Sequence, residues 1–168
     1  MRHVHGFTTR VDSKDYGENT TSVKLPEIKA KTQESHNGAT DLGLNNSMMA
    51  LEPLEPMVTI DGIEQDMAKY FALPPGQRVR FMFIGAVINH TDGVTDRHVI
   101  IIEGAPKQES AEEWKRGETN ETEFGFNDVR YYKRSINGET IDEIQHYPPK
   151  RIIGGVDFLR GVNNALYG

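Results

Sequence analysis

The chain of 168 residues contains no cysteine, which excludes disulfide bonds, zinc sites built on thiolates and catalytic cysteine nucleophiles. It also lacks a long apolar run. The longest, residues 81–88, is far short of the roughly 20 residues that a membrane helix needs. The first residues lack the apolar core of a signal peptide. We therefore expect synthesis in a cytoplasm and no membrane anchoring.

Excess positive charge is missing as well. The formal net charge is −6, and the lysines and arginines form no dense cluster of the kind that binds phosphates tightly. An acidic surface keeps a protein soluble and repels nucleic acid, but many ordinary soluble proteins share this charge. The hydrophobic fraction of 36% and the recurring aromatic and β-branched residues fit one folded domain over residues 1–168.

Catalytic and metal-binding patterns are equally scarce. The sequence has no glycine-rich phosphate loop, nucleophile elbow or His-Glu-x-x-His motif. His3 and His5 are spaced as two ligands on one face of a strand, but no acidic third ligand follows at a fixed spacing. Asp92, Asp96 and His98 could be imagined as a metal-binding triad. The turn already explains Asp92, and strand alternation alone places Asp96 and His98 on one face. We therefore predict no catalytic residue, no cofactor and no metal site.

Strand patterns dominate what is present. Residues 20–32 and 48–60 alternate between polar and apolar, and each changes parity once, near Pro26 and Pro53. A β-bulge produces such a change and is one of the few places where a strand tolerates proline. We expect two long, bent, half-polar strands. Several charged residues share one parity in them, or flank the change: Glu27, Lys29, Lys31, Glu52 and Glu55.

A long loop is predicted between these strands, over residues 33–47. This segment is rich in Gly, Asn, Ser and Asp, yet it carries Leu42 and Leu44. A solvated loop has no need of such residues, and loops of this length are uncommon unless they have a function. Two explanations stay open: the leucines tuck under their own domain, or they dock on a neighbouring molecule.

Two hairpins follow from turn dipeptides. Asp92-Gly93 and Asn137-Gly138 are both suited to the positive φ angles of a type I′ turn. The flanking strands are predicted at residues 78–90 and 94–103 and at residues 122–136 and 139–146. The hydrophilic segment between the hairpins, residues 108–121, is predicted to be a loop or a short helix.

Two helices complete the prediction. Asp61 resembles an N-cap with Glu64 at the capping-box position. The helix that follows has an apolar stripe, which we expect to cover a sheet, made of Ile63, Met67, Tyr70 and Phe71. At the C-terminus, Asp157 is placed to cap a short helix. The apolar face of this second helix consists of Phe158, Leu159, Val162 and Leu166.

Together these elements predict a mainly β protein, an antiparallel β-barrel or sandwich of six to eight strands with one firm α-helix and a short C-terminal helix.

Several segments, taken in order, resemble the major tail tube protein family of contractile-tailed temperate phages and of pyocin-like particles. Val-Lys-Leu-Pro-Glu-Ile at residues 23–28 is similar to the "V-x-L-P-x-L" strand of that family, and residues 41–44 are similar to its "D-L-G-L" loop. The further similar segments are the Asp-Gly at residues 61–62, residues 78–81, residues 128–132 before Asn137-Gly138, and residues 155–159. The resemblance spans roughly residues 15–168.

The resemblance implies a structural subunit and no enzyme. It implies homohexameric rings that close one continuous inner β-barrel and stack into a hollow tube. Its implied partners are further copies of itself, a tail sheath protein, baseplate and tail-terminator proteins, and DNA passing transiently through the lumen. The implied location is the virion tail, and the tube is driven through the bacterial envelope on contraction.

We expect the loop over residues 33–47 to make the contact between rings. The residues predicted for this contact are His36, Asn37, Asp41, Leu42, Gly43 and Leu44. A second hypothesis is that the helix over residues 63–71 faces the sheath, to which it presents Glu64, Asp66 and Lys69.

Three other readings compete with an infectious phage tail. The first is the tube of a phage-tail-like bacteriocin or secretion particle. The second is a β-barrel that binds a small ligand, which would need aromatic side chains gathered in one concave site. Tyr131 and Tyr132 are adjacent and therefore point to opposite faces of a strand. The third, an enzyme on a small barrel, would need a catalytic constellation.

Overall fold

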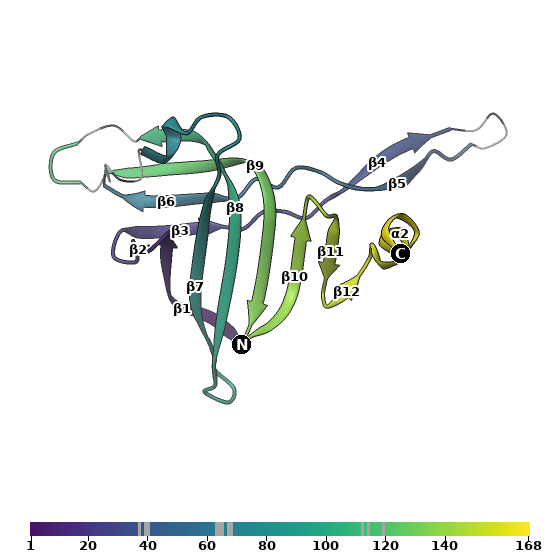
Figure 1. The fold of residues 1–168 in the computed structure, drawn as a ribbon. Helices are drawn as coiled ribbons and strands as arrows, with labels where there is room; N and C mark the ends of the chain where they lie inside the picture. The colour runs from purple at the N-terminus through teal and green to yellow at the C-terminus, as the bar shows by residue number, and fades with distance from the viewer. Residues whose placement is uncertain are drawn as a thin grey trace.

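The computed structural model of the chain describes residues 1–36, 38, 41–62, 66, 69–111, 113, 115–118 and 120–168. Figure 1 shows a body of strands, an arm of two strands that projects from one side of it, and a short helix at the C-terminus. No helix in the described ranges is long and apolar enough to cross a lipid bilayer.

Antiparallel strands make up most of the described chain. In order, the strands are β1 (Arg2–Val11), β2 (Lys14–Asp15), β3 (Thr20–Lys24), β4 (Ala30–Ser35), β5 (Leu44–Leu51), β6 (Met57–Asp61), β7 (Val79–Asn89), β8 (Thr95–Ala111), β9 (Glu121–Ile136), β10 (Glu139–Gln145), β11 (Lys150–Ile153) and β12 (Val156–Asp157). The helical elements are the 3-10 turn η1 (Lys69–Ala72) and α2 (Arg160–Tyr167).

The body is one antiparallel sheet of ten strands. Its main path runs β12-β11-β10-β9-β8-β7-β1-β2, and β6 joins from the other half of β9 with β3 at its far side. Within the described residues this order does not return to its start, so the sheet is open rather than a closed barrel. The predicted mainly antiparallel β class is confirmed.

A bend in β9 divides the sheet into two wings. Residues 121–125 of β9 pair with β6, whereas residues 131–136 of β9 pair with β10. The pairing with β8 shifts register between Glu103 and Ala105, opposite the bend. Gly104 fits there because an added Cβ would lie 3.1 Å from Val129 Cγ2 and 3.2 Å from the Asn127 carbonyl oxygen. A side chain at this position would require these neighbours to shift by a few tenths of an ångström.

The hydrophobic core lies between the two wings. Phe81 is at its centre, with its ring edge-on to Phe126 at a centroid distance of 4.5 Å and edge-on to Tyr70 at 6.5 Å. Val58 and Ile60 of β6 pack into the same core and are fully buried. Alternation along β6, β7 and β9 therefore supplies one apolar face from each wing.

The arm replaces the two long bent strands that the parity changes predicted. Residues 20–32 form β3 in the body and β4 in the arm, and residues 48–60 likewise contain parts of β5 and β6. The chain leaves regular strand structure at residues 25–29 and 52–56, around Pro26 and Pro53, instead of bulging within one strand. The predicted bulges were wrong for this reason, because a proline can end strand pairing as well as distort it.

The loop predicted over residues 33–47 is also shorter than expected. Ser35 pairs with Leu44, so seven of its fifteen residues, 33–35 and 44–47, belong to the two arm strands. Similarly, the loop or short helix predicted over residues 108–121 begins with strand, because β8 continues to Ala111.

Both predicted hairpins are confirmed. Asn137 and Gly138 have φ angles of 50° and 87°, as a type I′ turn requires, and Ile136 pairs with Glu139. The other turn is different: among residues 90–94 only Gly93 has a positive φ. The Asn89 N–H donates to the Val94 carbonyl oxygen, and the Val94 N–H donates to Asp92 Oδ1.

The two predicted helices have different outcomes. Ile63, Glu64 and Met67 lie outside the described residues; of the predicted segment, Asp66 is helical and η1 follows. The C-terminal helix is confirmed as α2. The helix begins at Arg160, with Leu159 at the N-cap position and no side-chain cap. The predicted cap, Asp157, accepts a hydrogen bond from the backbone N–H of Leu159, ahead of the helix.

The core predicts the effect of one substitution. Phe81→Ala should lower the free energy of unfolding by about 3–5 kcal/mol, since it empties the centre of the aromatic cluster. Phe158, which is 52% exposed, is the control: Phe158→Ala should change it by less than about 0.5 kcal/mol. Urea unfolding of the unassembled subunit measures both, and equal effects would contradict the proposed core.

Candidate self-assembly surface

The arm carries most of the residues predicted to contact a neighbouring molecule. Leu42 and Leu44 lie at its tip and are 72% and 56% exposed. Asp41 and His36 are exposed beside them, and Asn37 lies outside the described residues. The leucines are therefore not tucked under their own domain, which removes the first of the two explanations.

The tip has a defined local structure. The His36 imidazole lies 3.0 Å from the Glu34 carboxylate, and Asn46 Nδ2 donates a hydrogen bond to Ser35 Oγ at 2.8 Å. A Cβ at Gly43 would overlap the His36 ring, so glycine is what allows the ring to lie against this turn. The sequence-predicted tip residues His36, Gly43 and Leu44 are thus brought together by the hairpin.

Two polar contacts lie at the base of the arm, one between its two segments and one to the body. The Glu52 N–H donates to the Lys29 carbonyl oxygen at 2.9 Å, which continues the pairing of the two arm segments. Arg151 of β11 donates from Nη2 to the carbonyl oxygen of Met49 at 3.1 Å. This second bond ties the arm to the C-terminal part of the sheet, far away in the sequence.

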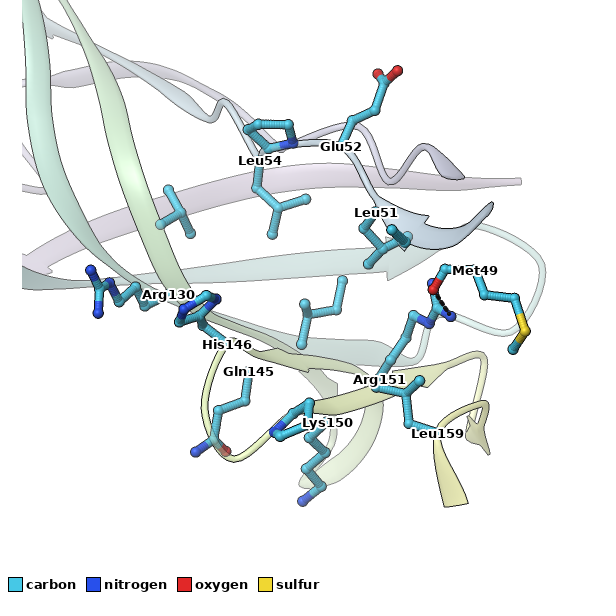
Figure 2. A pocket seen from close by; sticks show the side chains of 15 residues that line it. Met49, Leu51, Glu52, Leu54, Arg130, Gln145, His146, Lys150, Arg151 and Leu159 are labelled. Carbon is cyan, nitrogen blue, oxygen red and sulfur yellow. Dashed lines mark hydrogen bonds between the residues drawn. The ribbon is translucent and has the colours of Figure 1, made fainter. Parts of the chain in front are cut away.

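A groove of about 440 Å³ lies at this junction. Figure 2 shows that its walls come from the arm base on one side and from β10, β11 and the segment before α2 on the other. The apolar part of the lining consists of Met49, Leu51, Leu54, Val129, Ile144 and Leu159. We name this feature the arm-base groove.

Three of the six polar residues that line the arm-base groove are cationic, and one, Glu52, is anionic. Lys150 is 3.2 Å from Glu143, and Arg130 is 3.0 Å from Asp128, where its hydrogen bond holds the pKa of the Asp128 carboxyl below its usual value. Arg151 is only 8% exposed, and within the described part of the chain no carboxylate pairs with it. A buried guanidinium without a carboxylate partner attracts an anionic group.

Helix α2 extends the apolar surface beyond the groove. No residue of α2 is buried; Val162 and Leu166 are 42% and 64% exposed. Asn163 Nδ2 donates to the Pro149 carbonyl oxygen at 2.8 Å and so fixes the helix beside the groove. An exposed apolar helix face of this kind is typical of a surface that is covered in an assembly.

The residues predicted to face a sheath lie elsewhere. Asp66 accepts hydrogen bonds from Lys14 and from Lys69, and these two bonds lower the pKa of its carboxyl. Lys69 remains 76% exposed at its side chain, and Glu64 lies outside the described residues. The two described members are therefore adjacent and on the surface.

The residues considered as metal ligands have other partners. His3 stacks on His90 with ring centroids 4.2 Å apart, and β1 bulges between Val4 and Gly6, next to His5. Asp96 accepts a hydrogen bond from Asn137 Nδ2 and lies 3.7 Å from the Arg2 guanidinium. Among the described residues, no three His, Asp or Glu side chains gather as a metal site would require.

The arm-base groove was not predicted from the sequence. Its lining comes from segments around residues 50, 130, 145 and 159, and no local pattern connects them. The one usable signal was the C-terminal helix, whose apolar face had no predicted partner in its own segment.

Comparison with protein families decides the identity. The family described as "Phage tail tube protein FII" matches residues 1–166. The chain belongs to this tail tube family. The match confirms the resemblance drawn from the motifs and extends it over the first fourteen residues as well. The family is structural and not enzymatic.

Solved structures share the fold of this tail tube protein at low sequence identity. A chain from a structure titled as the sheath/tube terminator of an extracellular contractile injection system aligns with a TM-score of 0.56 at 10% identity, covering 81% of this chain and 96% of that one. The tube-terminating cap of the anti-feeding prophage aligns with a TM-score of 0.53 at 11% identity, covering 78% and 87%. A chain of an injection-system sheath–tube complex gives 0.50 at 10% identity, covering 76% and 88%.

No curated protein sequence matches the chain.

The contact between Arg151 and Met49 gives a testable prediction for the tube protein. Arg151→Met keeps the apolar stem but removes the hydrogen bond to the arm, so amide hydrogens of β5 should exchange about five- to thirty-fold faster, for a loss of 1–2 kcal/mol. Lys150 pairs with Glu143 and not with the arm, so Lys150→Met should leave the exchange of the β5 amide hydrogens unchanged. Unchanged exchange in both variants would contradict an arm held by Arg151.

Proposed function

We propose that this tail tube protein is the inner-tube subunit of a contractile tail. In this proposal residues 1–168 act as one tail tube domain, six copies close a ring, and rings stack into a hollow tube. The observation that carries the proposal is the arm, a projecting two-stranded ribbon with exposed leucines at its tip. A two-stranded ribbon is marginally stable alone in water and is stabilised when it packs on a further surface.

Open strand edges support assembly by further copies. β3 pairs only with β6 among the described strands, and each arm strand pairs only with the other. An unpaired strand edge invites another chain, and pairing between different edges of identical copies closes into a ring when the rotation allows it. The same edges would let copies extend one sheet around a central channel.

Charge supports a role in conducting DNA. Each chain carries −6, so a ring of six would carry −36, which discourages DNA from adhering to the wall. Glu27 and Lys29, where the chain passes from body to arm, have side chains that are 64% and 62% exposed. Such polar side chains suit a water-filled channel.

The proposed partners are the sheath, the baseplate and the terminator of a tail, and the proposed location is the virion tail. The exposed pair Asp66 and Lys69 is proposed to face the sheath. Penetration of the host envelope follows from the same role, because a tube inside a contracting sheath is pushed outward.

A second candidate is the tube of a particle that carries no genome, such as a bacteriocin or an injection particle. The fold shared with chains of extracellular contractile injection systems favours it. Nucleic acid extracted from purified particles separates the two, since only a phage tail joins a DNA-filled head.

The arm tip provides the first test. The double variant Leu42→Asp, Leu44→Asp should fold normally, because both side chains are exposed, but should form no long tubes in electron micrographs. Val94→Asp, at another exposed apolar position, should form tubes of normal length. Normal tubes from the double variant would refute the role of the tip in stacking.

Charge reversal tests the sheath-facing surface. Lys69→Glu should weaken co-assembly of the tube with its sheath, because it reverses an exposed charge without touching the core. Glu139→Lys, in the exposed turn between β9 and β10, serves as the control. Sheath decoration that is unaltered by Lys69→Glu, measured by micrographs of mixed components, would count against this assignment.

A further inference from the structure

We propose that the arm-base groove of one subunit receives the arm tip of a second copy. The inference rests on the proposed function, because it names the surface that the stacking tip would contact. It adds a defined partner site, formed by residues of β5, β10, β11 and the segment before α2.

Tip and groove belong to the same chain but cannot meet within it. The strand β4 has six residues, and at about 3.3 Å per residue it holds the tip roughly 20 Å from the arm base. The paired strands β4 and β5 keep this separation, since their ladder runs from Ala30 and Leu51 to Ser35 and Leu44. Figure 1 shows the paired strands β4 and β5 extending away from the body. Only another copy can bring a tip to a groove.

The apolar chemistry of the two surfaces matches. Leu42 and Leu44 are the exposed apolar residues of the tip, and the groove presents leucine, isoleucine and valine side chains at its wall. Leu51 and Ile144 face it from opposite sides. Seating the two leucines there removes apolar surface of both copies from water.

The charges match as well. Asp41 precedes Leu42 at the tip and is exposed. Arg151, buried in the groove wall, has no carboxylate partner in the described part of its own chain, and Lys150 lies next to it. Insertion of the tip brings the Asp41 carboxylate to this cationic side of the groove. An opposite charge offsets part of the desolvation of a buried guanidinium.

The contact is heterologous, because the tip and the groove are different surfaces of the molecule. Such a contact leaves one unused tip and one unused groove at the ends of any row of subunits, so it continues from copy to copy. Where the rotation between copies does not close a ring, it produces a row of unlimited length, as stacking of rings requires.

Cross-linking between single-cysteine variants tests the inference, because the natural chain has no cysteine. Leu42→Cys is mixed in equal amounts with His146→Cys or with Met49→Cys, two exposed positions on opposite sides of the groove. Tubes are assembled from each mixture and treated with a short bismaleimide. Each mixture should yield at least ten-fold more cross-linked dimer than a mixture of Leu42→Cys with Glu139→Cys.

The outcomes separate this inference from the proposed function. Tubes that form with no more dimer than the control overturn the groove as the receiving site and leave the tube function standing. More dimer from Leu166→Cys with His146→Cys than from either tip mixture would show that α2 of a neighbour occupies the groove, which also overturns the inference. Failure of the natural chain to form any tube overturns the proposed function and, with it, the groove.

Discussion

The bend of β9 is the constraint on which the rest of the body depends. One strand belongs to both wings, because its first half pairs with β6 and its second half with β10. Gly104 allows β8 to follow this bend, and Asp128, with a φ of 50°, turns the chain of β9 itself. Hydrogen bonds from Arg78 and Arg130 hold the Asp128 carboxylate in place. Straightening β9 would separate the two apolar faces and expose the core.

The bend also positions the surfaces that we propose to face other molecules. Val129 lies at the bend and lines the arm-base groove, so the core and the groove share one structural support. The arm leaves the body between β3 and β6, and Arg151 connects it to the C-terminal strands. The arm is therefore held at a fixed place on the sheet.

The sequence predicted the parts of the fold that local chemistry determines. Asn137 and Gly138 specify their turn because both need a positive φ, and the flanking strands follow from alternation. The arm was predicted less well, because a parity change at Pro26 or Pro53 is the same pattern whether a strand bulges or ends. The tip leucines could be recognised as unusual in a polar segment, but the groove is built from side chains brought together only by the folded sheet. Arg151 illustrates the difference. Its guanidinium is buried, with no carboxylate partner among the described residues, only in the folded chain, where β11 lies against the arm.

The projecting arm gives every subunit a direction. A stack in which all arms point the same way presents protruding hairpins at one end and empty hollows at the other. A protein that begins the structure and one that finishes it therefore meet surfaces of opposite shape, and each can recognise its own end without reading any other feature. A factor bound at either end of such a stack would block addition of subunits at that end alone.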